Sequence, residues 1–168
     1  MAKRLTYAMV GGGPDGFIGD AHRRAIGLDG TAAIAAGVFS RNREKSLQMA
    51  ESLGLSPDRC YEDYQTMARA EGEREDGIDF VTVVTPNQSH YEICRAFLEA
   101  GIHVVCDKPV TTTYRQAKEL EALAEDKGLL FMVTYTYMGY VTAKYARELV
   151  ASGAIGEVRT VMAEYPQG

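Results

Sequence analysis

Short runs compatible with β-strands alternate with segments of helical spacing along this chain, and this alternation restricts the fold more than any other feature. The expected strands are Leu5–Val10, Ala32–Phe39, Ile78–Thr85, Ile102–Cys106, Leu129–Tyr135 and Glu157–Tyr165, and the expected helices are Gly19–Leu28, Arg43–Leu53, Tyr61–Ala70, Ser89–Ala100, Thr112–Lys127 and Ala143–Ser152. Strands that alternate with helices pair in parallel through right-handed crossovers. The strands read as apolar on both faces, as a sheet covered on both sides requires. The pattern therefore predicts an α/β fold with a doubly wound parallel sheet.

The composition argues against several classes of protein and partner. The 168 residues suit one domain with a short extension, and 46% apolar and 24% charged residues are ordinary for a globular protein. The formal net charge of −5 argues against general binding to nucleic acid or to an anionic membrane. The sequence shows neither the apolar core of a signal peptide nor the run of about 18 apolar residues that a membrane helix needs.

The cysteines predict neither a disulfide framework nor a metal site. Cys60, Cys94 and Cys106 are odd in number, and no two of them have C-x-x-C spacing. Buried free thiols in a reducing compartment are the simplest interpretation. We therefore expect a cytoplasmic protein without a bound metal.

Two polar features are predicted to serve the fold rather than the chemistry. The charged run Glu71–Gly77, "EGEREDG", is expected to be a solvated loop, because runs of charge rarely form packed structure. His22 follows Gly19 by three positions. We expect His22 to pack against or cap a helix rather than to act in catalysis.

A glycine-rich turn follows the first predicted strand, in the stretch "MVGGGPDGFIGDAH". Gly11, Gly13 and Gly16 satisfy the spacing G-x-G-x-x-G, which lets backbone N–H groups and a helix N-terminus approach a pyrophosphate. Asp15 is irregular there, because it brings negative charge towards an anion. Gly19 is a second candidate for close packing between helix and strand, with the helix expected to begin near Ile18 or Gly19. The alternative is a structural turn without a ligand.

The end of the second predicted strand favours NADP over NAD. A carboxylate is expected there to hold the ribose 2′-hydroxyl of NAD, but this chain reads "GVFSRNREK". Ser40 takes that place and is followed by Arg41, with Arg43 and Lys45 nearby. A hydroxyl followed by a guanidinium suits a 2′-phosphate. Two alternatives remain for Arg41, which are a solvated surface position and stacking on the adenine.

Polar residues also follow the strand that ends in "VVTPNQSH". Ligands of doubly wound sheets lie beyond the carboxyl ends of strands. Thr85 and Asn87 offer polar groups there, Pro86 shapes the turn, and Ser89 is a candidate N-cap. His90 is expected on the first turn of the helix, facing either a ligand or solvent.

A charged pair, Asp107 and Lys108, follows the next strand in "VVCDKPV". A charged pair is unusual where a strand leaves the core. A lysine at such a position suits proton handling during a reaction. The alternative is a surface salt bridge between the two side chains.

Three blocks together resemble the glucose–fructose oxidoreductase, inositol dehydrogenase and MocA-like family. They are "MVGGGPDGFIGDAHRRAI", "VVTPNQSHYEICRAFLEAGIHVVCDKPVTTT" and "ELVASGAIGEVRTVMAEY". The resemblance implies a Rossmann domain that binds NAD or NADP, and a second α+β domain with an open antiparallel sheet. It also implies hydride transfer to or from sugars, polyols or related hydroxy compounds, and a homo-oligomer for the full-length form.

The resemblance also implies the site residues. The cofactor is expected against Gly11, Gly13, Phe17, Ile18, Gly19, Ser40, Arg41, Thr85, Pro86, Asn87, His90, Asp107 and Lys108. The glycines and the Phe17–Gly19 turn would hold the pyrophosphate, and Ser40 and Arg41 would flank the adenosine ribose. Lys108 is the expected catalytic residue, near the nicotinamide and the reacting hydroxyl. Pro109 would fix the turn, often through a cis peptide bond.

The chain departs from the family pattern in three respects. Asp107 replaces the glutamate of the usual E-K-P motif, and Thr136 stands where many members place asparagine. The chain is roughly half as long as family members, and the family's D-x-x-x-H catalytic pair is not found in it. We therefore expect a Rossmann domain over 1–150 and the first strand of a truncated second domain within 151–168. Such a fragment is predicted to bind dinucleotide but to turn over poorly.

Two rival functions remain open from the sequence. One is a non-catalytic dinucleotide sensor or partner module, which the shortened second domain favours. The other is a different enzyme on a similar sheet, such as an S-adenosylmethionine methyltransferase. The Ser40-Arg41 pair and the D-K-P block argue against the methyltransferase, which usually has an acidic residue after the second strand.

Overall fold

The computed structural model describes residues 3–166 and contains two compact units, one ending at Thr134 and one beginning at Tyr135. The first unit is built on a five-stranded sheet in the order β2-β1-β3-β4-β5, with every neighbouring pair parallel. The strands are β1 (Leu5–Gly11), β2 (Ala32–Val38), β3 (Phe80–Val84), β4 (His103–Cys106) and β5 (Phe131–Val133). The helices are α1 (Phe17–Gly27), α2 (Arg43–Ser52), α3 (Tyr64–Glu73), α4 (His90–Glu99) and α5 (Tyr114–Asp126), with α6 (Val141–Ala151) in the second unit.

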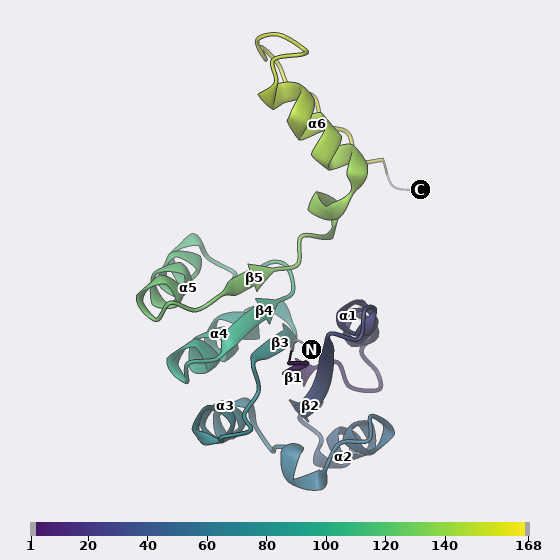
Figure 1. Cartoon of the computed structure of the whole chain (residues 1–168), viewed down its shortest axis with the longest axis vertical. Helices are drawn as coiled ribbons and strands as arrows, with labels where there is room; N and C mark the ends of the chain where they lie inside the picture. Colours follow the sequence, from purple (N-terminus) through teal and green to yellow (C-terminus); the bar gives the residue numbers. More distant parts are fainter. Residues whose placement is uncertain (1–2, 167–168) are drawn as a thin grey trace. The chain divides into compact units, whose positions relative to one another are not determined.

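Helices cover both faces of the sheet, which confirms the predicted doubly wound architecture (Figure 1). Successive residues of β1 point to opposite faces. Ala8 and Val10 pack in the core beneath α3, α4 and α5, whereas Tyr7 and Met9 pack in the core beneath α1 and α2. Both faces of β1 are therefore covered by buried side chains, as the apolar run from Leu5 to Val10 predicts.

Short polar side chains set the starts of several helices. Asn42, Asp63 and Thr113 each accept a hydrogen bond from the backbone N–H three residues later, which satisfies one of the free donors of the first turn. Gly101 ends α4 with a φ of +81°, a conformation that glycine adopts without a steric penalty. These local signals explain why the observed helix ends lie close to the predicted ones.

The prediction of a solvated loop over Glu71–Gly77 is wrong at its first residues. The Asp63 cap moves the start of α3 to Tyr64, and the helix continues to Glu73. The Glu71 carboxylate is buried. It forms a 2.6 Å ion pair with the Arg59 guanidinium and accepts a 2.7 Å hydrogen bond from the Tyr61 hydroxyl. Burial and the contact with Glu71 raise the pKa of Tyr61 to about 12. A long-range partner therefore brings this charge into the interior.

The topology leaves a crevice at the carboxyl end of β1. The chain reaches β2 through α1, then crosses back past β1 to pair β3 on its other side. The helices that follow β1 and β3, α1 and α4, consequently pack on opposite faces of the sheet. Ligands of doubly wound sheets bind at such a switch point.

The second unit does not contain the predicted strand. Residues 157–166 are exposed and form neither helix nor strand, because a segment becomes a strand only when its backbone forms a ladder with a neighbouring strand, and the five-stranded sheet does not include them. The Tyr137 and Tyr165 hydroxyls lie 2.8 Å apart within this unit. The sheet-bearing unit ends before α6, and the domain boundary near residue 150 stays a prediction. Over residues 3–166, every helix falls short of the length and hydropathy needed to cross a bilayer.

Candidate functional site

A cleft of about 690 Å³ lies at the carboxyl ends of β1, β2 and β3. Its walls come from the glycine turn, from residues 38–41 at the end of β2, from residues 62–65 at the start of α3 and from the turn after β3. The predicted cofactor residues that line it are Gly11, Gly13, Ser40, Arg41, Thr85 and Pro86. The other predicted residues do not line it; they are Phe17, Ile18, Gly19, Asn87, His90, Asp107 and Lys108.

The glycine turn is packed so tightly that side chains are excluded. A Cβ on Gly11 would lie 2.6 Å from the Val84 carbonyl oxygen, and one on Gly13 would lie 2.7 Å from the Phe39 carbonyl oxygen. A Cβ on Gly19 would overlap the Cα of Gly12. Gly19 therefore brings α1 against the turn, the close-packing role that the sequence suggested, and its position is buried rather than open to the cleft.

Helix α1 begins at Phe17, one residue before the earliest predicted start. Its N-cap is Gly16, which has no side chain to satisfy the first N–H groups and which lines the cleft. Phe17 and Ile18 lie in this first turn, and the Phe17 side chain projects into solvent rather than into the cleft. The open N-terminus of α1 favours an anion at this edge of the cleft.

The negative charge of Asp15 is neutralised by a neighbouring helix. Its carboxylate forms a 2.6 Å ion pair with the Lys45 ammonium of α2. This hydrogen bond and charge raise the pKa of Lys45. The irregularity noted in the sequence is thus a link between the glycine turn and the end of β2, and it removes the repulsion that a free carboxylate would exert on an anion.

The residues after β2 have distinct roles. The Ser40 hydroxyl accepts a hydrogen bond from the Asn42 N–H at 3.1 Å, which shapes the turn into α2. The Arg43 guanidinium points away from the cleft and donates to the Cys60 carbonyl oxygen at 2.7 Å. Arg41 lines the cleft and has no hydrogen-bond or ion-pair partner among residues 3–166. Its guanidinium is therefore available to a ligand.

His90 corrects a prediction, because its side chain faces neither a ligand nor solvent. It is 0% exposed, with Nε2 2.8 Å from the Thr85 carbonyl oxygen and Nδ1 2.8 Å from the Pro109 carbonyl oxygen. Ser89 occupies the N-cap position but does not cap α4, since its hydroxyl donates to the Pro86 carbonyl oxygen at 2.7 Å and accepts from the Thr85 hydroxyl at 2.8 Å. Asn87 is exposed at the start of the short 3-10 turn Asn87–Ser89, which precedes α4.

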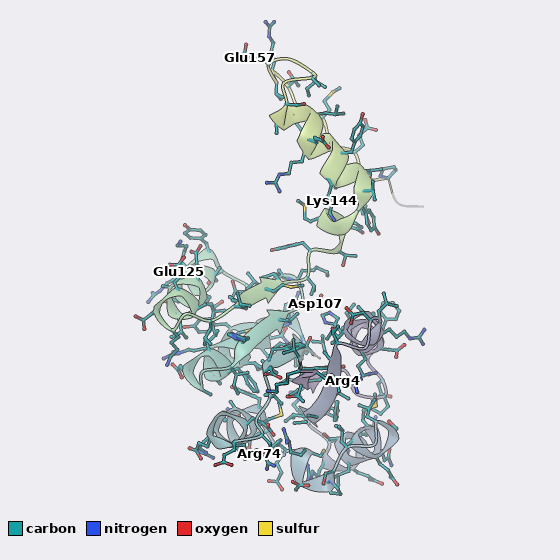
Figure 2. The ribbon with its side chains drawn as sticks, viewed as in Figure 1. Arg4, Arg74, Asp107, Glu125, Lys144 and Glu157 are labelled. Atoms are coloured by element: carbon teal, nitrogen blue, oxygen red, sulfur yellow. The ribbon has the colours of Figure 1, made fainter. Side chains whose placement is uncertain are left out.

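Asp107 and Lys108 lie where the chain leaves β4, and Figure 2 labels Asp107 there. The Asp107 carboxylate accepts a 2.8 Å hydrogen bond from the Thr134 hydroxyl and lies 3.7 Å from Nε2 of His22. Lys108 is exposed and pairs with none of the described residues, so the alternative of a salt bridge to Asp107 is wrong. The peptide bond between Lys108 and Pro109 is cis, as expected.

His22 is buried, as its expected packing role requires, and sequence reasoning missed its contact with Asp107. Its Nδ1 lies 3.1 Å from the Thr82 hydroxyl of β3. Burial lowers the pKa of His22, and the nearby Asp107 opposes this effect. This contact joins α1 to the turn that carries Lys108. The only sequence signal for the contact between His22 and Asp107 is the position of His22, about one helical turn after Gly19.

Comparison with known proteins identifies the family. Residues 5–135 match the sequence model of GFO_IDH_MocA, an oxidoreductase family with an NAD-binding Rossmann fold. The chain belongs to this family. The oxidoreductase YfiI of Bacillus subtilis is 42% identical over the whole chain, which covers 43% of that protein. Levoglucosan dehydrogenase of Pseudarthrobacter phenanthrenivorans is 26% identical over 98% of the chain and is covered over 42% of its length.

Solved structures of GFO_IDH_MocA members show the same architecture. An inositol dehydrogenase homolog of Azotobacter vinelandii, complexed with NAD+, superposes with a TM-score of 0.90 at 42% identity. The match covers 95% of this chain and 41% of that one. An oxidoreductase of Pseudomonas syringae gives a TM-score of 0.89, also at 42% identity, over 95% of this chain and 44% of that one. The present chain thus spans less than half the length of the relatives it matches.

Proposed function

We propose that this chain binds NADP or NAD in the cleft and supplies the cofactor-binding part of an oxidoreductase acting on a sugar, polyol or related hydroxy compound. The observation that carries the proposal is the cleft itself. It lies at the topological switch point, and it combines a turn that only glycine fits with an open helix N-terminus and a free arginine. Similarity to levoglucosan dehydrogenase and to an inositol dehydrogenase homolog supports the substrate class.

The residues of the cleft suit the parts of a dinucleotide. The N–H groups of the glycine turn and the first turn of α1 would hold the pyrophosphate, and Ser40 and Arg41 would hold the adenosine ribose. Thr85 and Pro86 would contact the middle of the cofactor. The bound nicotinamide would supply the hydride acceptor or donor. Lys108 would orient the substrate hydroxyl at Nζ and take or return its proton.

We propose a cytoplasmic location and, for the full-length form, a homo-oligomer. Cys60, Cys94 and Cys106 are all buried free thiols, which suits a reducing compartment. No nucleic-acid or membrane partner is proposed, in keeping with the net charge of −5.

The choice between the two dinucleotides depends on Arg41. We expect Arg41→Ala to weaken NADPH binding about 10–100-fold, because a hydrogen bond to a charged group contributes roughly 1.5–3 kcal/mol. NADH, which lacks the 2′-phosphate, should lose less than about threefold. Calorimetric titration of both cofactors measures this difference.

Arg115→Ala is the charge-matched control for Arg41→Ala. Arg115 lies on α5, is exposed and pairs only with Glu119 among the described residues, so its loss changes the net charge equally without touching the cleft. We expect it to leave both affinities unchanged. Equal losses of NADPH and NADH in Arg41→Ala, or tighter binding of NADH by the unmodified chain, would overturn the assignment of Arg41 to a 2′-phosphate.

Turnover tests the oxidoreductase part of the proposal. We propose that the 168-residue chain binds cofactor but turns over well below the roughly 1–1,000 per second of typical enzymes. Nicotinamide absorbance, followed with alditols, cyclitols and aldoses, gives the rate. Rapid turnover by this chain alone would contradict the expected weak activity.

A further inference from the structure

The two ring nitrogens of His90 face two backbone carbonyl groups at the start of α4. Nε2 lies 2.8 Å from the Thr85 oxygen and Nδ1 lies 2.8 Å from the Pro109 oxygen, and the side chain is completely buried. A carbonyl oxygen can only accept a hydrogen bond, so each nitrogen must carry a proton to make its contact. A neutral imidazole has one N–H group. Its second nitrogen would place a lone pair against a carbonyl lone pair, with no water between them.

We propose that His90 is a protonated imidazolium that ties the turn after β3 to the turn after β4. Thr85 lines the cleft, and Pro109 directly follows Lys108. The two N–H donors therefore fix the spacing between the cofactor cleft and the turn that carries the proposed catalytic lysine. Because His90 is buried, it is a positioning residue and touches neither cofactor nor substrate. Its effect on Lys108 rests on the proposed function, whereas its protonation does not.

The surroundings of His90 contain groups that stabilise a buried cation. Burial opposes the charge, but the Cys106 thiol of β4 and the two carbonyl oxygens outweigh it and raise the pKa of His90 to about 9. The hydrogen bond with the Cys94 thiol of α4 and the contact with His90 in turn lower the pKa of Cys106, against the opposing effects of burial and of the Asp107 charge. For His22 the effect of burial outweighs the opposing effect of Asp107, so the pKa of His22 is lowered. The pKa values of the two buried histidines are therefore shifted in opposite directions.

Nuclear magnetic resonance of the ring nitrogens tests the charge in the unmodified chain. The sequence has only three histidines, His22, His90 and His103, so a long-range proton–nitrogen spectrum of the labelled protein is simple. At about pH 7.5, well above the ordinary histidine pKa of about 6.5, we expect both His90 nitrogens to be protonated. His22 should show one protonated and one bare nitrogen at that pH. A bare nitrogen on His90 would overturn the proposal.

His90→Gln tests the positioning role, with His103→Gln as the matched control. The glutamine amide carries both of its N–H donors on one nitrogen, so it cannot reach two carbonyl oxygens on opposite sides as the imidazolium does. One of the two carbonyl contacts is therefore lost. We expect the amide signals of Thr85 and Lys108 to shift and NADH affinity to fall about tenfold, whereas His103→Gln leaves both unchanged. An unmoved Lys108 signal in folded His90→Gln would contradict the role. If His90→Gln does not fold, the spectrum of the unmodified chain still decides the charge.

The two readouts separate this inference from the proposed function. Two protonated nitrogens on His90 in a chain that binds no dinucleotide would uphold the imidazolium and overturn the proposed function. A neutral His90 in a chain that binds NADH would overturn the imidazolium and leave the proposed function standing.

Discussion

Gly19→Ala is expected to reduce the binding of NADH and NADPH by about 100-fold, because an added methyl group cannot be accommodated between α1 and the glycine turn. A Cβ at this position overlaps the Cα of Gly12 and lies 3.1 Å from its carbonyl carbon and oxygen. These are backbone atoms, which cannot rotate away. The methyl group must push the N-terminus of α1 off the turn, so the donors that would face the pyrophosphate no longer converge. Calorimetric titration gives the loss directly.

Gly27→Ala is the matched control on the same helix. Gly27 is the last residue of α1, is exposed, and a Cβ there meets no atom within 4 Å. We expect unchanged affinity and a stability equal to or slightly above that of the unmodified chain, because alanine favours the helix by roughly 0.5–1 kcal/mol over glycine. Gly19→Ala with an affinity within threefold of Gly27→Ala would contradict the assigned role of the turn.

Glu71→Ala is expected to lower the free energy of unfolding by about 3–5 kcal/mol, because it leaves a largely buried guanidinium without its buried partner and with only the longer, exposed ion pair to Asp76. The Arg59 side chain is only 11% exposed, and its ion pair with Glu71 is the shortest contact that holds it. The Tyr61 hydroxyl loses its acceptor in the same step. Since a domain of this size is stable by roughly 5–15 kcal/mol, this loss is a large share. Urea denaturation followed by circular dichroism measures it.

Glu73→Ala serves as the control for Glu71→Ala. Glu73 lies on the same helix, carries the same charge and is exposed. Substitutions at such surface positions usually change stability by less than about 0.5 kcal/mol. If the two variants differ in unfolding free energy by less than about 1 kcal/mol, the Arg59–Glu71–Tyr61 network does not stabilise the fold as we infer.

Features that depend on local sequence could be predicted in this chain. The alternation of apolar runs and helical spacing indicates the parallel sheet, and the glycine spacing indicates the tight turn between β1 and α1. Ser40 and Arg41 follow the end of β2 by two and three positions, and both line the cleft. In each case the chain itself, within a few residues, supplies the signal.

Features that depend on distant partners could not be predicted. Glu71 reads as part of a solvated charge run until Arg59 and Tyr61 are brought beside it. His90 reads as a ligand residue until Pro109, 19 positions later, closes over its second nitrogen. Residues 157–165 have strand propensity, but the backbone ladder of the described sheet does not include them. Propensity is a local property, whereas burial, ion pairing and strand pairing are decided by the fold.

Binding of a dinucleotide in the cleft can be measured by titrating the nitrogen-labelled chain with NADPH and then NADH while its backbone amide signals are followed. We expect concentration-dependent shifts of Gly11, Gly12 and Gly13, of Arg41 and of Thr85, all of which lie on the cleft. NADPH should also shift Arg41 further than NADH does. The absence of shifts at millimolar cofactor, or shifts confined to the surface between α3 and α4, would contradict the claim that this cleft binds a dinucleotide.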